Sequence, residues 1–334
     1  MGNTQLSEDD IDRETIKSSV IKSSWNPILM IRLGIVGLDT SHAGEFTRRF
    51  NHIGIDEEQW VDGARVVAAY AGESKIKTKK EIGAEAKILV ERFGIELVNH
   101  PEDMLGKIDA VLIESQEGGS HLSYAKPFIK KGMPTFIDKP FTCSLAEAKV
   151  LSRLATKKKA PLFSSSSLRY AIEIQRLKSS MAEVGSIVGA DAYSPASLHP
   201  ANPGLFHYGI HAVETLYALM GPGCKSVWCV YDESCEVVTG LWLDGRIGVV
   251  RGTRRGPHGY GFTAFCEKQV VSAQINTAFI YRELLKQMVK MFQTGRAPLN
   301  IAETIEIVAF IEAALDSAKN YGRKTELAFS TGMK

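Results

Sequence analysis

Short apolar runs alternate with longer helical patterns through the first half of the chain. Runs typical of buried strands lie at residues 31–36, 66–70, 95–98, 109–113 and 135–137. Between them, helices are expected at about 41–51 and 75–93, with Gly94 as a left-handed cap, and a Ser144–Glu147 capping box predicts another. Strands alternating with helices predict βαβ units and a parallel sheet. We therefore expect a doubly wound, Rossmann-type α/β domain at residues 30–160.

The second half has a different pattern. Helices are expected at about 171–184 and 208–220, and two more, at about 279–294 and 301–320, end the chain. Successive β-type runs lie between them, at residues 226–231, 236–243, 247–252 and 261–275. Asp244-Gly245 is a hairpin-turn sequence. This pattern predicts an α+β domain at residues 161–334 with a mainly antiparallel, open sheet.

Composition agrees with two globular domains. The chain has 334 residues, of which 44% are hydrophobic and 23% charged, so gross disorder is excluded. Lys and Arg number 40 against 38 for Asp and Glu, a net charge of +2 that argues against a nucleic-acid or anionic-membrane partner. No apolar run approaches the ~18 residues that span a bilayer.

The cysteines and the N-terminus indicate the compartment. Five cysteines, an odd number without CxxC spacing, are typical of reduced thiols and favour a cytoplasmic protein. Residues 1–29 are polar and lack the apolar stretch of a secretory signal. We expect them to form a flexible leader.

The turn after the first strand departs from a dinucleotide-binding fingerprint. That fingerprint would place glycines at positions 37, 39 and 42, so that the backbone can approach a pyrophosphate. Only Gly37 is present. Asp39 adds negative charge where a phosphate would approach, and His42 replaces the glycine that allows the helix to pack closely against the strand. Asp39 or Ser41 could instead simply cap the helix.

Candidate residues after the later strands are less specific. Glu73 could bind the ribose hydroxyls of NAD, whereas Ser74 and Lys75 suit the 2′-phosphate of NADP. All three are residue types of exposed turns, which favours a solvated loop over either role. Gln116 lies on the loop after the fourth strand. Glu114, at the end of that buried strand, is an unusual residue there and has no assigned role.

Three segments resemble the Gfo/Idh/MocA family of nicotinamide-dependent oxidoreductases. Residues 134–140 read PTFIDKP and resemble its Glu-Lys-Pro signature after a strand, with Asp138 in place of the glutamate. Arg169, in the sequence SLRY, resembles the arginine that the family has after the fifth strand of its sheet. Residues 204–221, GLFHYGIHAVETLYALMG, resemble its Asp-x-Gly-x-His helix, with His207 at the aspartate position.

The resemblance implies NAD or NADP as cofactor and hydride transfer to or from a sugar, polyol or related hydroxy compound. It implies His211 as the acid/base, Lys139 as the group that polarises the substrate oxygen, and His207 beside His211. The cofactor-binding candidates are Gly37, Asp39, Thr40, Ser41, His42, Glu73, Gln116, His121, Asp138, Lys139 and Arg169. It also implies a homodimer or homotetramer formed through the second sheet.

Other functions remain open at this point. The changes at Asp39, His42 and His207 also suit a catalytically degenerate sensor that keeps the cleft, and some members of the family are NAD-assisted glycoside hydrolases. His207 and His211 lie one helical turn apart and could ligate zinc, but no third ligand stands at motif spacing, so no metal site is expected.

Overall fold

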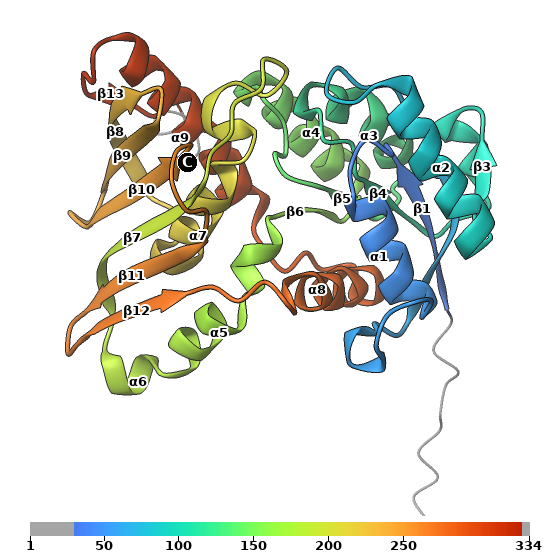
Figure 1. The fold of residues 1–334 in the computed structure, drawn as a ribbon, viewed down its shortest axis with the longest axis horizontal. Helices are drawn as coiled ribbons and strands as arrows, with labels where there is room; N and C mark the ends of the chain where they lie inside the picture. The colour runs from blue at the N-terminus through green and yellow to red at the C-terminus, as the bar shows by residue number, and fades with distance from the viewer. Residues whose placement is uncertain (1–29, 329–334) are drawn as a thin grey trace, which may run out of the picture.

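The structure, a computed structural model, describes residues 30–328 (Figure 1). The predicted leader at 1–29 lies outside the described residues. The first sheet is parallel throughout and has the order β3-β2-β1-β4-β5-β6. Its strands are β1 (Ile31–Val36), β2 (Ala64–Tyr70), β3 (Glu96–Val98), β4 (Ala110–Ile113), β5 (Thr135–Ile137) and β6 (Leu162–Ser164). The chain order reverses between β1 and β4, which confirms the doubly wound prediction and locates the switch point where such folds bind ligands.

Four helices connect these strands: α1 (His42–Asn51), α2 (Lys79–Phe93), α3 (His121–Lys130) and α4 (Leu145–Lys158). A capping box between Thr78 and Glu81 starts α2 four residues later than predicted, and Gly94 ends it in the left-handed conformation as expected. The predicted Ser144 capping box is wrong. The Ser144 side chain makes no capping hydrogen bond, and its N–H donates to the Thr142 hydroxyl rather than to Glu147. The first helical N–H, at Leu145, donates to Glu312 of a distant helix.

The second sheet has the order β12-β11-β7-β10-β9-β8-β13 and is antiparallel except for the β7–β10 pair. The mainly antiparallel prediction is therefore confirmed. The strands are β7 (Ile187–Pro195), β8 (Cys224–Asp232), β9 (Cys235–Trp242), β10 (Ile247–Thr253), β11 (Gly261–Cys266), β12 (Val270–Gln274) and β13 (Thr325–Glu326). The expected run at 261–275 is thus a hairpin, and the helix expected at 171–184 divides into α5 (Ile172–Ser179) and α6 (Met181–Val184).

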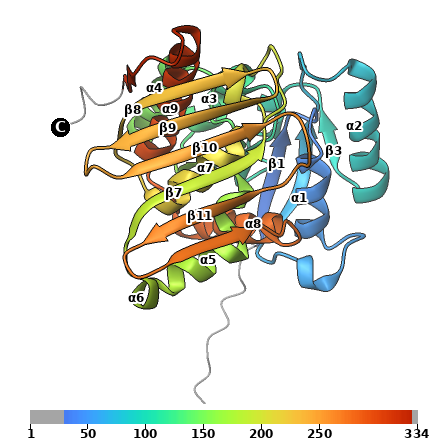
Figure 2. The ribbon, with the colours of Figure 1, turned by 60° about the vertical axis from the view of Figure 1, so that its left-hand side comes forward.

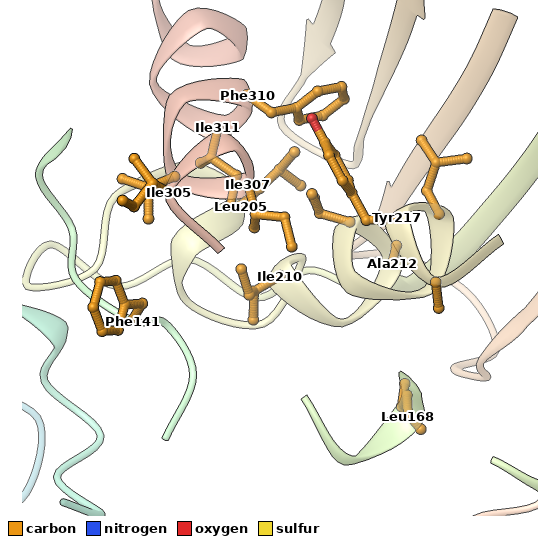
Figure 3. Close-up of a cluster of buried hydrophobic side chains, with 14 of the residues drawn as sticks. Phe141, Leu168, Leu205, Ile210, Ala212, Tyr217, Ile305, Ile307, Phe310 and Ile311 are labelled. Atoms are coloured by element: carbon orange, nitrogen blue, oxygen red, sulfur yellow. The ribbon is translucent and has the colours of Figure 1, made fainter. Parts of the chain in front are cut away.

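The remaining helices join the two halves. Helices α7 (Ile210–Met220) and α9 (Ile301–Lys319) cover one face of the second sheet, whose other face is open (Figure 2). Phe310 of α9 packs on Tyr217 of α7, with ring centroids 5.8 Å apart (Figure 3). Helix α8 (Ile280–Thr294) instead packs against α1, and its Leu285 and Met288 lie in the same buried cluster as residues of β1. None of the described helices is both long and apolar enough to cross a bilayer.

Candidate functional site

A cavity of about 410 Å³ lies between the two halves, at the carboxyl ends of β1, β4 and β5. Its volume is typical of small-molecule sites. The first half contributes Thr40, Ser41, His42, Lys77, Gln116 and Lys139, and the rest of the lining comes from Ser167, Leu168, Tyr208, His211, Tyr260, Thr277, Ile280 and Tyr281. The structure therefore brings together Lys139, His211 and the first turn, which are far apart in the sequence.

Gly37 and Asp39 shape the first turn. Gly37 has a φ of 94°, and a Cβ there would lie 2.5 Å from the backbone nitrogen of Ser115, so only glycine fits. The Asp39 carboxylate is buried and accepts a hydrogen bond of 2.9 Å from the Gln116 N–H. It is not among the side chains that line the cavity. The negative charge of Asp39, which is unfavourable near a phosphate, is thus partly compensated by a backbone donor of the neighbouring loop.

Helix α1 begins at the cavity, and Ser41 makes no capping hydrogen bond there, so the alternative in which Asp39 or Ser41 caps it is wrong. Thr40 accepts a hydrogen bond of 3.2 Å from the first helical N–H, at His42, through its hydroxyl. The N–H groups that follow in the first turn of a helix attract anions when no side chain occupies them. This end of α1 can therefore receive a phosphate.

The loop at residues 114–120, hereafter the β4 loop, is fixed from several sides. Asn202 donates to the Gln116 carbonyl (2.7 Å) and accepts from the Gly118 N–H (3.0 Å). Glu117 pairs with Lys75 at 2.7 Å. Neither contact was predicted, because nothing in the sequence relates residue 202 or residue 75 to this loop. Together they hold Gln116 rigidly at the cavity.

Three predicted cofactor residues lie away from the cavity lining. His121 is fully buried, with Nε2 2.6 Å from the Ser115 carbonyl and Nδ1 3.2 Å from the Phe141 carbonyl. Glu73 donates its backbone N–H to the Tyr124 hydroxyl. Arg169 is buried against two carboxylates, Glu214 at 2.9 Å and Glu303 at 2.6 Å. These contacts stabilise the walls of the site.

Lys139 and His211 line the cavity together. The peptide bond between Lys139 and Pro140 is cis, and the Lys139 side chain is buried, with its ammonium 3.8 Å from Asp138 Oδ2. His211 Nδ1 lies 2.7 Å from the Ser166 hydroxyl, so Nε2 is the nitrogen left for a ligand. Burial, and then the charge of Lys139, lower the pKa of His211 well below its usual value. The ring is therefore neutral at physiological pH.

His207 lies behind this pair, next to His199, with ring centroids 5.5 Å apart. It is not among the cavity-lining residues, and its Nδ1 is buried without a hydrogen-bond partner. Burial, and then Lys139, lower the pKa of His207 to about 4. A neutral imidazole thus stands where the resembled family has an aspartate.

His42 links the cavity to two buried carboxyl groups. Its Nδ1 lies 2.8 Å from Asp138 and 3.8 Å from Glu114. Burial alone would raise the pKa of Asp138, but His42 and Lys139 lower it to about 2. Burial, and then Asp138, raise the pKa of Glu114 well above its usual value. Two neighbouring carboxyl groups therefore differ sharply in acidity.

Comparison with known proteins identifies the class of this site. Residues 31–166 match the family model described as "Oxidoreductase family, NAD-binding Rossmann fold", the Gfo/Idh/MocA model. Residues 31–166 are therefore similar to the Gfo/Idh/MocA family, which confirms the predicted resemblance and the nicotinamide cofactor class that goes with it. No curated protein gives a significant sequence match.

Solved structures share the fold over most of the chain. A probable dehydrogenase from Thermotoga maritima is 19% identical with a TM-score of 0.74, and the alignment covers 89% of this chain and 99% of that one. A putative myo-inositol dehydrogenase from Sinorhizobium meliloti is 15% identical, with a TM-score of 0.74 and coverage of 90% and 100%. The scyllo-inositol dehydrogenase from Lactobacillus casei, solved with NAD(H) and scyllo-inositol, is 15% identical with a TM-score of 0.74. The alignment covers 90% of this chain and 99% of that one.

The residues of the first turn and the cavity fit a nicotinamide dinucleotide. Gly37 lets the first turn lie directly against the backbone of Ser115, and the start of α1, which Ser41 does not cap, offers N–H groups to a phosphate. Lys77 adds positive charge at the cavity, and Gln116 lines it as well. The first turn, Lys77 and Gln116 would hold the cofactor.

Proposed function

We propose that this protein transfers hydride between NAD or NADP and a hydroxyl-bearing carbon of a sugar, polyol or related hydroxy compound. One observation carries the proposal: a buried ammonium, Lys139, and a neutral imidazole, His211, line one cavity together with residues of the first turn, the turn that follows β1. The bound cofactor supplies the acceptor or donor of hydride. The two side chains supply what remains, which is control of the hydroxyl proton.

In this proposal, His211 takes the hydroxyl proton at Nε2, because Nδ1 is bonded to Ser166. A buried imidazole of low pKa is a weak base on its own. Lys139 compensates, since its positive charge stabilises the alkoxide and so makes the hydroxyl more acidic. His207 keeps the site free of the negative charge that an aspartate would add, and Tyr208 and Tyr260 offer hydroxyls to the substrate.

The test is turnover by Lys139→Met. A methionine fills the same space without charge, so oxidation of sugars and polyols, followed by nicotinamide absorbance, should fall at least about 10³-fold while the cofactor still binds. Lys130→Met, at an exposed lysine of α3, is the matched control and should keep wild-type activity. Equal rates in Lys139→Met and wild type would contradict the proposed roles. A wild type that binds cofactor but turns over none of these compounds would favour the degenerate sensor.

The open face of the second sheet supports a further part of the proposal, that two or four copies associate there. Exposed apolar side chains are spread over its strands: Val188, Trp228, Val230, Ile247, Phe265 and Val270. Such a patch is costly to leave in water and is typical of protein interfaces.

All five cysteines are free thiols, which supports a cytoplasmic location.

A further inference from the structure

The buried end of β4 carries a carboxyl group that the proposed reaction does not use. Glu114 follows the last residue of β4 and is fully buried. Neither of its carboxylate oxygens has a hydrogen-bond partner. A buried carboxyl group without partners is strongly unfavourable, whether it is ionised or holds a proton that finds no acceptor. The fold therefore leaves the hydrogen-bonding capacity of Glu114 unmet.

The neighbours of Glu114 have the composition of a metal site. His42 Nδ1 lies 3.8 Å from Glu114 Oε2 and 2.8 Å from Asp138 Oδ2. One ligand atom from each of the three residues lies within 4.8 Å of the other two, and all three residues are buried. Residues 30–328 bring no other three such side chains this close together. The three come from α1, β4 and the segment after β5, so the ends of these elements meet here.

Charge points to a cation. Glu114 and Asp138 bring two negative charges when ionised. The cationic groups nearby lie beside Asp138, with His42 Nδ1 at 2.8 Å and the Lys139 ammonium at 3.8 Å from its carboxylate. Glu114 has no counter-charge that close, since His42 Nδ1 is 3.8 Å away. A divalent ion would neutralise the Glu114 carboxylate and would give both of its oxygens a partner at once.

We propose that His42, Glu114 and Asp138 bind one divalent transition-metal ion. An imidazole nitrogen with two carboxylate oxygens is a donor set that suits Zn²⁺ and Mn²⁺, whereas Ca²⁺ needs six to eight oxygen ligands. The ion joins α1 to the ends of β4 and β5. It lies behind the His42 ring, which lines the cavity, and on the Asp138 side of Lys139. The site is independent of the HxxxH pair, because His211 Nδ1 is bonded to Ser166.

Metal binding can be measured without knowing the substrate. Full-length protein is stripped with EDTA and titrated by calorimetry with ZnCl₂ and, separately, with MnCl₂. We expect one ion per chain. Glu114→Gln keeps the shape but removes the charged ligand, and should weaken binding at least about 100-fold. Glu117→Gln, on the same loop but paired with Lys75, should bind like wild type.

Thermal unfolding gives a second readout that also reports folding of the variants. The ion should raise the melting temperature of wild type and Glu117→Gln but not of Glu114→Gln, since a ligand stabilises only the state that binds it. Asp138→Asn provides the same test if Glu114→Gln does not fold. Two results would overturn the proposal. Wild type that binds neither ion at millimolar concentration would show that Glu114 holds a proton instead. Wild-type binding by both ligand variants would place the ion elsewhere, for example on His207 and His211.

Discussion

Burial decides the chemistry of individual residues in this cleft. His207 and His211 are held neutral by desolvation and by the positive charge of Lys139, while Asp138, equally buried, is held ionised by His42 and Lys139. The side chains facing the cavity include lysines and imidazoles, whereas Asp39, Glu114 and Asp138 lie behind its wall. The site is thus arranged to stabilise negative charge on a bound oxygen.

The low pKa of His207 predicts a pH dependence of stability. In the unfolded chain its imidazole has an ordinary pKa near 6.5, against about 4 in the fold. Between these values the unfolded state binds more protons, so the free energy of unfolding falls as pH falls from 6.5 to 4. His207→Gln removes this contribution and should lose less stability than wild type over that window in urea unfolding. His258→Gln, at an exposed histidine, should follow wild type. A His207→Gln profile parallel to wild type would refute this explanation.

A strand or helix could be predicted from the sequence where the residues of that one segment carry all the information needed, such as an apolar run and the residue that ends it. Residues 31–36 are apolar apart from Arg32, because β1 is buried from Leu33 onward, and Gly37 marks its end. Contacts between distant elements could not be predicted. Arg169 of the short turn at Ser167–Tyr170 pairs with Glu214 of α7 and Glu303 of α9, which lie 45 and 134 residues away. Glu114 did give a signal, a charged residue ending a buried strand, but its neighbours His42 and Asp138 appear only in the fold.

The Arg169 network is expected to be essential for stability. Arg169→Met leaves Glu214 and Glu303 buried without their counter-charge, so the free energy of unfolding should fall by about 3–5 kcal/mol. Arg32→Met breaks a similar pair with Asp109, but at the exposed surface, and should scarcely move the urea midpoint. Similar midpoints for the two variants would mean that the buried pairs contribute little.

At the scale of the whole molecule, the two halves share their cores and the second sheet faces outward. Helix α8 belongs in sequence to the second half but packs under the first sheet, so the cleft is bordered by elements that cross between the halves. The opposite side of the molecule is the open sheet face (Figure 2). The candidate site and the proposed subunit interface are therefore on different surfaces.

A charge on the open face should separate the subunits. Val230 on β8 is 72% exposed, and Val230→Glu would place a carboxylate in the proposed interface. Light scattering after gel filtration should show a dimer or tetramer for wild type and a smaller species for the variant. Val150→Glu, at an exposed valine of α4, should keep the wild-type mass. A monomeric wild type would exclude the interface.

The central claim is that the glycine-poor first turn still serves a nicotinamide cofactor, because the Asp39 carboxylate accepts from the Gln116 N–H and Ser41 does not cap the start of α1. The most direct test is calorimetric titration of protein shown to lack copurified nucleotide with NAD⁺, NADH, NADP⁺ and NADPH. The structure predicts micromolar binding of the oxidised and reduced forms of one pair, and loss of that binding in Gly37→Val. No binding of any of the four up to millimolar concentration would contradict the claim.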